Sequence, residues 1–222
     1  MNIQDNLNTI ISKLPKHVTL VAVSKTKPVT DIMQAYNAGQ RVFGENKIQE
    51  MVEKHELLPE DIQWHMIGHV QRNKVKYMAG FVSLIHGVDN FKLLKEINKQ
   101  AIKHNRIINC LLQIKIAEED TKFGMTAQEA NIILQSEVFS ELNNIQVTGV
   151  MGMATFTDDK EQIKREFKHL KQTFDDLKSI DTKNSKMQTI SMGMSGDYEM
   201  AIACGSTMIR VGSSIFGVRN YH

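Results

Sequence analysis

The chain contains 222 residues, of which 27 are lysine or arginine and 25 are aspartate or glutamate, for a formal net charge of +2. At this length roughly 70% or more of the unfolded chain's surface can be buried on folding, so one core can form without disulfides or a structural metal. We therefore expect a single globular domain over residues 1–222. The near-neutral charge disfavours a nucleic-acid binder, because such proteins neutralise many phosphates with a basic surface.

No apolar run approaches the roughly 18 residues that a membrane-spanning helix needs. The first residues, MNIQDNLNTIISKLPKH, lack the basic-then-apolar order of a signal peptide. These features predict a cytoplasmic protein without a membrane segment. Cys110 and Cys204 are far apart and lie in no metal-ligand spacing, so we expect two reduced thiols and no metal site. No segment indicates a subunit interface, and a monomer is expected.

Short apolar or β-branched runs alternate with longer amphipathic stretches along the chain. A helix is expected first, at 2–14. Strands are then expected at 17–24, 41–44, 62–68, 81–88, 106–116, 145–153, 187–194 and 207–216. Helices are expected between them at 30–38, 46–57, 70–79, 90–104, 126–142, 158–179 and 196–203. Asp89 or Asn90 is a good N-cap for one of these helices, and Thr126 with Glu129 forms a capping box for another.

Eight strands with seven intervening helices predict a (β/α)8 TIM barrel with an extra N-terminal helix, in the α/β class. The competing topology is an open, doubly wound sheet. Its dinucleotide-binding members carry GxGxxG in the first strand-to-helix turn, whereas this turn reads SKTKP. The barrel is therefore preferred.

The unusual residues of the chain follow the ends of the expected strands. Since the carboxyl ends of all barrel strands meet at one face, these residues are expected to converge on one ligand site. In chain order they are Lys25, Glu45, Asn46, His69, His86, Lys122, the segment 151–153 and the segment 191–195.

Lys25 is the first candidate for chemistry, because it directly follows a strand that reads VTLVAVS. Partial desolvation in a barrel mouth favours the neutral amine, which is a nucleophile toward carbonyl groups. A Schiff base with an aldehyde substrate or a cofactor aldehyde is the chemistry that such a lysine supports. The alternative is a strand-end lysine whose side chain extends to water.

Two late loops, SMGMSGD and CGSTM, offer small residues and hydroxyl groups, and we take them as loops after the seventh and eighth strands. Backbone N–H groups and hydroxyls of this kind hold a phosphate in the late loops of many barrels. The candidate contacts are Ser191, Ser195, Ser206 and Thr207. Helix capping and close packing at glycine are the alternative explanation.

Arg210 lies inside the last expected strand, where alternation places it on the same face as Met208 and Gly212. If that face points inward, the guanidinium enters the barrel and needs a partner. It can donate to a cofactor ring nitrogen, or it can form a structural ion pair with an interior acid such as Glu45. Both alternatives remain open from the residues alone.

Polar residues near the second and third strand ends also have two interpretations. Asn46 is either a ligand contact or the cap of the helix that follows it. His65 and His69 either line the site or hold neighbouring elements, and a lone strand histidine is more often a satisfied core group.

The segments AVSKTKP (22–28), FGENKIQE (43–50), WHMIGHVQRNK (64–74) and ISMGMSGDYEMAIACGSTMIRVGSSIFG (190–217) together resemble the YggS/PROSC family of pyridoxal 5′-phosphate-binding proteins. The motifs occur in the order typical of that family and extend over most of the chain. The family is similar to the N-terminal barrel of alanine racemase but lacks the second, β-rich domain of that enzyme.

This resemblance implies that pyridoxal 5′-phosphate is held as a Schiff base on Lys25, with Arg210 facing the pyridine nitrogen and Asn46 beside the ring. It also implies that the phosphate is surrounded by Ser191, Ser195, Gly205, Ser206, Thr207 and Gly212. Lys122 is a weaker correspondence, because Phe123 follows it where relatives commonly read KSG.

Three functions are consistent with these residues. The resemblance favours a non-catalytic protein that holds the cofactor, delivers it to apoenzymes and maintains vitamin B6 and amino-acid pools. An amino-acid racemase needs a second base opposite Lys25, for which the sequence offers only His65 or His86. A Schiff-base aldolase acting on a sugar phosphate would use Lys25 without any cofactor and would be colourless.

Overall fold

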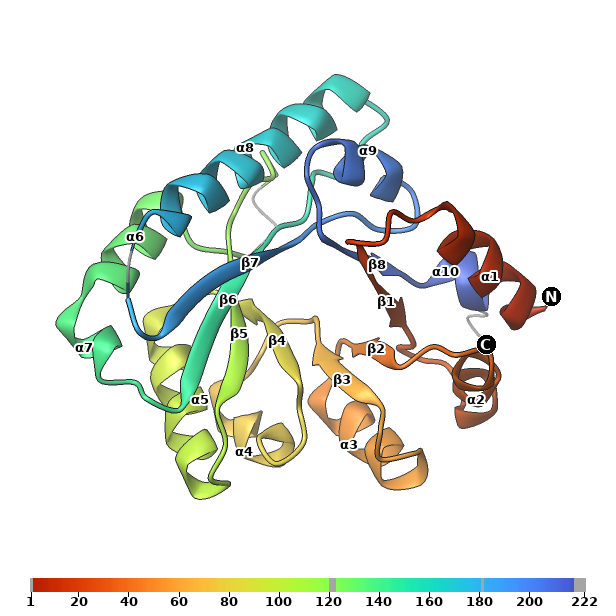
Figure 1. The fold of residues 1–222 in the computed structure, drawn as a ribbon, viewed down its shortest axis with the longest axis horizontal. Coiled ribbons are helices and arrows are strands. Elements are labelled where there is room, and N and C mark those ends of the chain that lie inside the picture. Colours follow the sequence, from red (N-terminus) through yellow and green to blue (C-terminus); the bar gives the residue numbers. More distant parts are fainter. Residues whose placement is uncertain (1, 120–122, 181, 218–222) are drawn as a thin grey trace.

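The computed structural model describes residues 2–119, 123–180 and 182–217. Within these residues, eight parallel strands close into a barrel in the order β1 to β8, and the helices cover its outside (Figure 1). The strands are β1 (Thr19–Val23), β2 (Val42–Glu45), β3 (Gln63–Met66), β4 (Leu84–Val88), β5 (Ile108–Gln113), β6 (Ile145–Met151), β7 (Ser185–Ser191) and β8 (Met208–Val211). The predicted (β/α)8 barrel is confirmed.

The helices follow the expected alternation with the strands. They are α1 (Ile3–Lys13), α2 (Val29–Asn37), α3 (Ile48–Leu57), α4 (Val75–Met78), α5 (Phe91–Lys103), α6 (Ala127–Gln135), α7 (Glu137–Ser140), α8 (Lys160–Lys178), α9 (Tyr198–Ala203) and α10 (Ser213–Phe216), with a 3₁₀ turn, η1 (Arg72–Lys74). Among the described helices, none combines the length and the apolar character needed to cross a bilayer.

Three expected elements differ in the structure. The helix expected at 70–79 is reduced to η1 and the single turn α4. The helix expected at 126–142 is interrupted at Ser136, whose backbone is extended and whose hydroxyl accepts a hydrogen bond from Phe139 N to begin α7. The strand expected at 207–216 ends at Val211, and α10 follows it.

The extra N-terminal helix is confirmed as α1. Ile3, Leu7 and Ile10 recur at helical spacing and are buried, and the side chain of Asn2 caps the helix. The helix packs against α10 and α2, and Figure 1 shows it beside α10. Asn6 Nδ2 donates to the Ile215 carbonyl at 3.0 Å, which fixes that contact. The beginning and end of the described chain therefore lie together on one side of the barrel.

The buried apolar residues of the described chain form two separate clusters. The larger cluster lies between the barrel and its helices, and the smaller one fills the barrel interior with Val21, Leu84, Leu111, Met151 and Met208. Buried polar side chains, His65, His86, Ser191 and Arg210, lie among these strands, and the register pairs Arg210 with Val21 and Ser191 with Met208. The barrel interior therefore combines an apolar core with buried polar groups.

Gly149 shows how closely β6 and β7 approach each other. Its φ is +158°, and a Cβ atom at this position would lie 1.8 Å from the Thr189 carbonyl oxygen. We expect Gly149→Ala to lower the free energy of unfolding by at least about 1–3 kcal/mol, as overpacking does. Thermal and urea denaturation measure the effect. Gly39→Ala is the matched control, because Gly39 has a φ of +100° but a Cβ atom there would meet no other atom within 4 Å.

If Gly39→Ala destabilises the protein as much as Gly149→Ala does, the backbone conformation and not the contact with Thr189 explains the loss.

Candidate functional site

A cavity of about 680 Å³ opens at the carboxyl ends of the barrel strands. The residues that line it include Lys25, Asn46, Ser195, Arg210 and Gly212, which come from the ends of β1, β2, β7 and β8. All five are candidates that the sequence indicates. The convergence expected at the barrel mouth is therefore present for them.

Asn46 does not cap the helix that follows it. The N-cap position of α3 is Lys47, which makes no side-chain capping bond, and Asn46 lines the cavity instead. The backbone of Asn46 is also approached closely by the loop after β3, because a Cβ atom at Gly68 would lie 2.4 Å from the Asn46 carbonyl oxygen. Of the two alternatives for Asn46, the capping role is therefore wrong, and the ligand contact stays a prediction.

Hydrogen-bond donors gather where α10 begins. The first backbone hydrogen bonds of α10 run from Ile215 N and Phe216 N to the Gly212 carbonyl. The N–H groups of Ser213 and Ser214 come before these bonds, at the start of the helix. Ser195 Oγ accepts a hydrogen bond from Gly212 N at 3.3 Å and joins the loop after β7 to this corner. Ser195, Gly212 and Ser213 all line the cavity, so this corner presents hydroxyl and N–H groups to a ligand.

Arg210 forms part of the cavity wall while being only 4% exposed. Its Nη1 donates to Ser191 Oγ at 2.6 Å and its Nη2 donates to the Gly152 carbonyl at 3.0 Å. Burial lowers the pKa of Arg210 to about 10, and the nearby Asp197 carboxylate opposes that decrease. The guanidinium therefore stays charged at neutral pH. An ion pair between Arg210 and Glu45, one of the two alternatives, is wrong, because Glu45 bonds to Ser24 and Lys54.

Gly205, Ser206 and Thr207 do not line the cavity. They precede β8, whereas the cavity lies at the strand's other end. Ser206 Oγ donates to the Met192 and Met208 carbonyls at 2.8 and 3.0 Å, and Thr207 Oγ1 accepts from Ile190 N at 2.9 Å. The hydroxyls of this loop thus join β7 to β8. The loop has a packing role, which is the alternative to phosphate binding for this sequence.

The remaining candidates lie in three different places. Ser191, His65 and His86 are buried inside the barrel and do not line the cavity. His69 does line the cavity, and its ring stacks on Phe123 with centroids 4.5 Å apart. Lys122 lies outside the described residues, so its expected role stays a prediction.

The loop that carries Lys25 is held by a buried cluster that sequence reasoning missed. Lys54 on α3 is 6% exposed and donates to the Ser24 carbonyl at 2.7 Å, to Glu45 Oε1 at 2.8 Å and to Glu50 Oε1 at 2.7 Å. Glu50 Oε1 also accepts from Thr26 N at 2.5 Å. Both neighbours of Lys25 in the chain are therefore bonded to this cluster.

Thr26 adopts a φ of +61°, which is uncommon for a residue other than glycine. The bond from its N–H to Glu50 supports this conformation. Glu45 is fully buried, and burial raises the pKa of its carboxyl, whereas Lys54 and the Ser24 hydroxyl lower it. Ser24, Glu45, Glu50 and Lys54 together hold the turn that presents Lys25, and we call them the Lys54 cluster.

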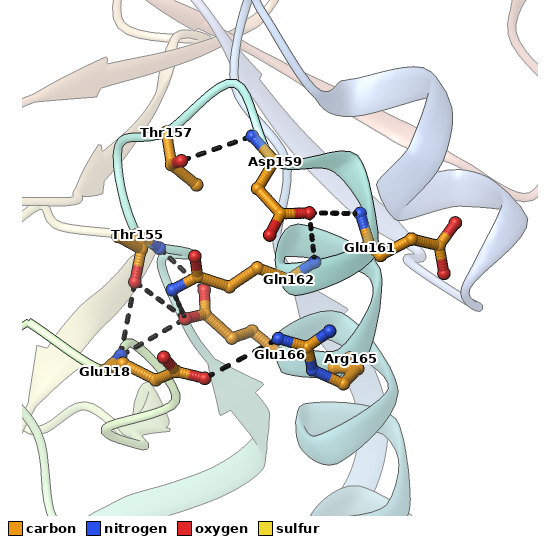
Figure 2. A network of polar contacts seen from close by, with 8 residues as sticks. All are labelled: Glu118, Thr155, Thr157, Asp159, Glu161, Gln162, Arg165 and Glu166. Atoms are coloured by element: carbon orange, nitrogen blue, oxygen red, sulfur yellow. Dashed lines mark hydrogen bonds and ion pairs between the residues drawn. The ribbon is translucent and has the colours of Figure 1, made fainter.

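A second network fixes part of the cavity rim (Figure 2). The Glu166 carboxylate on α8 is 4% exposed and accepts from Thr155 N at 2.7 Å, from Thr155 Oγ1 at 2.6 Å and from Glu118 N at 3.2 Å. Glu118 follows β5 and Thr155 follows β6. One carboxylate therefore ties together the two loops whose aromatic residues, Phe123 and Phe156, line the cavity mouth with exposed fractions of 57% and 93%.

The sequence does contain signals for both networks. Glu50 and Lys54 have the i, i+4 spacing of a helical ion pair, and Glu45 directly ends a buried strand. Glu166 occurs within an amphipathic helix on a face shared with buried Ile163, Phe167 and Leu170. What the sequence does not show is which loops these side chains reach.

The sequence profile of the family described as alanine racemase, N-terminal domain, matches residues 1–220. The chain belongs to this family. The curated proteins with sequences similar to this chain include several named pyridoxal phosphate homeostasis protein. The protein of Haemophilus influenzae is 36% identical over 100% of this chain and 98% of its own length, and that of Escherichia coli K12 is 36% identical over 96% and 91%.

Solved structures agree with the sequence relatives. PipY of Synechococcus elongatus PCC7942, solved without PLP, superposes with a TM-score of 0.91 at 33% identity and covers 97% of this chain and 100% of its own. The same protein with PLP bound gives a TM-score of 0.87. Alanine racemase of Bartonella henselae shares the fold with a TM-score of 0.73 at 15% identity, and only 58% of its longer chain is covered.

Replacing Lys54, the cation of the Lys54 cluster, tests how much this buried charge contributes to the stability of the fold. We expect Lys54→Met to lower the free energy of unfolding by about 3–5 kcal/mol, because the buried Glu45 carboxylate then lacks its charged partner. Urea denaturation monitored by Trp64 fluorescence measures the loss. Lys47→Met, at the exposed start of the same helix, is the control and is expected to change stability by no more than about 0.5 kcal/mol. A loss below about 1 kcal/mol in Lys54→Met would show that the cluster is not stabilised by that pair.

Replacing one carboxylate oxygen tests the rim network. Glu166→Gln places an NH₂ group against N–H and O–H donors, so we expect a loss of about 1–3 kcal/mol and faster amide hydrogen exchange at 116–119 and 154–157. Mass-spectrometric hydrogen exchange on the full chain measures it. Glu161→Gln on the exposed side of the same helix is the matched control. Equal exchange rates in the two variants would contradict the assignment of Glu166.

Proposed function

We propose that this protein binds pyridoxal 5′-phosphate (PLP), holds it as a Schiff base on Lys25 and serves intracellular PLP and amino-acid homeostasis without catalytic turnover. The observation that carries the proposal is the convergence of three chemistries in one cavity. These are the amine of Lys25, the guanidinium of Arg210, and the hydroxyls of Ser195 and Ser213 with the N–H groups at the start of α10, beside Gly212. The names of the relatives, and PLP in the PipY structure, support it.

The cavity offers groups suited to three parts of this cofactor, namely its phosphate, its aldehyde and its pyridine nitrogen. The donors at the start of α10 suit a phosphate, which binds well to N–H groups at a helix start and to hydroxyls. A side chain at position 212 would crowd this corner, because a Cβ atom there would lie 3.1 Å from the Val23 carbonyl oxygen. We therefore place the phosphate against Gly212, where no side chain intervenes, with Ser195 and Ser213 as the donors, in place of Gly205, Ser206 and Thr207.

When bound, PLP supplies an aldehyde that reacts with amines and a pyridine ring that can delocalise electrons. Lys25 presents its amine to the aldehyde carbon, where a C=N bond forms and water leaves. Arg210 can only donate hydrogen bonds, so its guanidinium binds a ring nitrogen that carries no proton. Asn46 lines the same cavity and would contact the ring.

The placement of the histidines supports a carrier over a racemase. Racemisation needs a second base opposite Lys25, and His65 and His86 are the candidates for it. Burial lowers the pKa of His65 to about 3 and that of His86 well below its usual value, and both rings lie inside the barrel. An unprotonated ring nitrogen bound by Arg210 also weakens electron withdrawal from the substrate carbon.

We further infer that the acceptors of the cofactor are PLP-dependent apoenzymes, that the protein acts in the cytoplasm and that it is a monomer. The cavity opens at the barrel mouth between Phe123, Phe156 and Met194, so bound PLP would be reached from one side. An acceptor enzyme would meet the cofactor at this mouth.

Borohydride reduction tests the covalent contact. The purified full chain is incubated with PLP, its visible spectrum is recorded, and the sample is reduced and digested. We expect a yellow wild-type protein, bleaching on reduction and the label on the peptide containing Lys25. In Lys25→Ala the label at this peptide is lost, whereas Lys47→Ala, outside the cavity, matches the wild type.

A wild type that takes up no PLP would contradict the proposal and would favour the aldolase alternative. Exchange of the Cα proton of amino acids in D₂O by the PLP-loaded protein, at rates well above free PLP, would instead favour the racemase.

A further inference from the structure

Four buried polar side chains form a continuous series of hydrogen bonds across the barrel interior. His65 Nδ1 lies 3.0 Å from His86 Nε2, His86 Nδ1 lies 3.0 Å from Ser191 Oγ, and Arg210 Nη1 lies 2.6 Å from the same oxygen. The residues come from β3, β4, β7 and β8, and none is more than 5% exposed. This series of hydrogen bonds therefore spans the barrel and ends at the cavity wall formed by Arg210.

The chemistry of Arg210 determines which group donates and which accepts in each of these hydrogen bonds. A guanidinium only donates, so Ser191 Oγ accepts from Arg210 and its own proton is directed elsewhere. His86 Nδ1 is the partner in reach, and it accepts that proton only if it carries none. The neutral ring of His86 then has its proton on Nε2, which donates to His65 Nδ1.

A charged histidine does not fit this arrangement. Protonated His86 would leave the buried Ser191 proton without an acceptor among the described residues, and it would place a second cation in the same buried space. Among the described residues, the ionisable groups that face His86 are His65 and Arg210, with Asp197 beyond Arg210. Burial and these two neighbours lower the pKa of His86 well below its usual value, which agrees with a neutral ring.

We propose that His86 is a positioning residue for Arg210, and that His65 and His86 are both neutral with their protons on Nε2. His86 orients the Ser191 hydroxyl, and Ser191 holds Nη1 while the Gly152 carbonyl holds Nη2. Both terminal nitrogens are thus attached to the barrel wall, which fixes the orientation of the guanidinium toward the cavity. The effect on PLP rests on the proposed function, whereas the proton positions do not.

The proton positions are tested without cofactor. The full chain, labelled with ¹⁵N in histidine, is studied by long-range ¹H–¹⁵N correlation NMR between pH 5 and 8, with His65→Phe and His86→Asn used for assignment. We expect two histidines that keep the pattern of a neutral ring protonated on Nε2 throughout this pH range. A proton on Nδ1 of His86, or its titration above pH 5, would overturn the proposal.

The positioning role is tested with two variants of His86. His86→Leu removes the acceptor for the Ser191 proton, whereas His86→Asn keeps an acceptor oxygen near the position of Nδ1. We expect PLP affinity to fall by about tenfold in His86→Leu, the effect of one lost hydrogen bond to a charged group, and to stay within about threefold in His86→Asn. The absorption spectrum of bound PLP is expected to change in the Leu variant and to recover in the Asn variant.

Circular dichroism and thermal melts establish that each variant is folded before binding is compared. A folded His86→Leu protein with wild-type affinity and spectrum would overturn the positioning role. If the wild type binds no PLP, the proposed function fails, and the NMR result still decides whether the hydrogen-bond chain exists as described.

Discussion

The pairing of β1 with β8 is the constraint on which the site depends. The register places Thr19 beside Met208 and Val21 beside Arg210, so the first and last strands share one wall of the barrel. Lys25 leaves this wall from β1, and Arg210 and Gly212 leave it from β8. Lys27 Nζ reinforces the junction by donating to the Phe216 and Gly217 carbonyls at 2.9 and 3.2 Å. Groups from opposite ends of the chain meet only because the barrel closes.

Lys54 and Arg210 are buried cations that are stabilised in different ways. Lys54, on α3, is bonded to the carboxylates of Glu45 and Glu50. Arg210, inside the barrel, is bonded to a hydroxyl and a carbonyl, and Asp197 acts on it only as a nearby charge. A carboxylate paired directly with Arg210 would cancel its charge. Neutral partners hold the guanidinium in place and leave its charge available to the cavity.

Much of the fold could be predicted because strand and helix periodicities differ and the elements alternate regularly. The inward direction of Arg210 follows from alternation with Met208 and Gly212, and the structure confirms it. The break at Ser136 was missed because a serine fits both a helix interior and a cap. The α10 turn was missed because a single turn of four residues has too few positions to show a period.

The candidate site was predictable where it depends on strand ends and not where it depends on loop geometry. Lys25, Asn46, Ser195 and Gly212 follow strand ends closely, and they line the cavity. The loop 205–207 precedes a strand, and the similarity of its sequence to a phosphate loop concealed its opposite position. Glu166 and Lys54 act on loops far from them in sequence, a relation that no local pattern encodes.

The Lys54 cluster has a consequence for the thermodynamics of ligand binding. Ser24 and Thr26, the two neighbours of Lys25, are already bonded to side chains of β2 and α3 before any ligand arrives. The conformational entropy of this turn is therefore lost during folding and not during association. A ligand that reacts at Lys25 meets a backbone that is already ordered, so its affinity is set by the contacts it makes and not by the cost of arranging the loop.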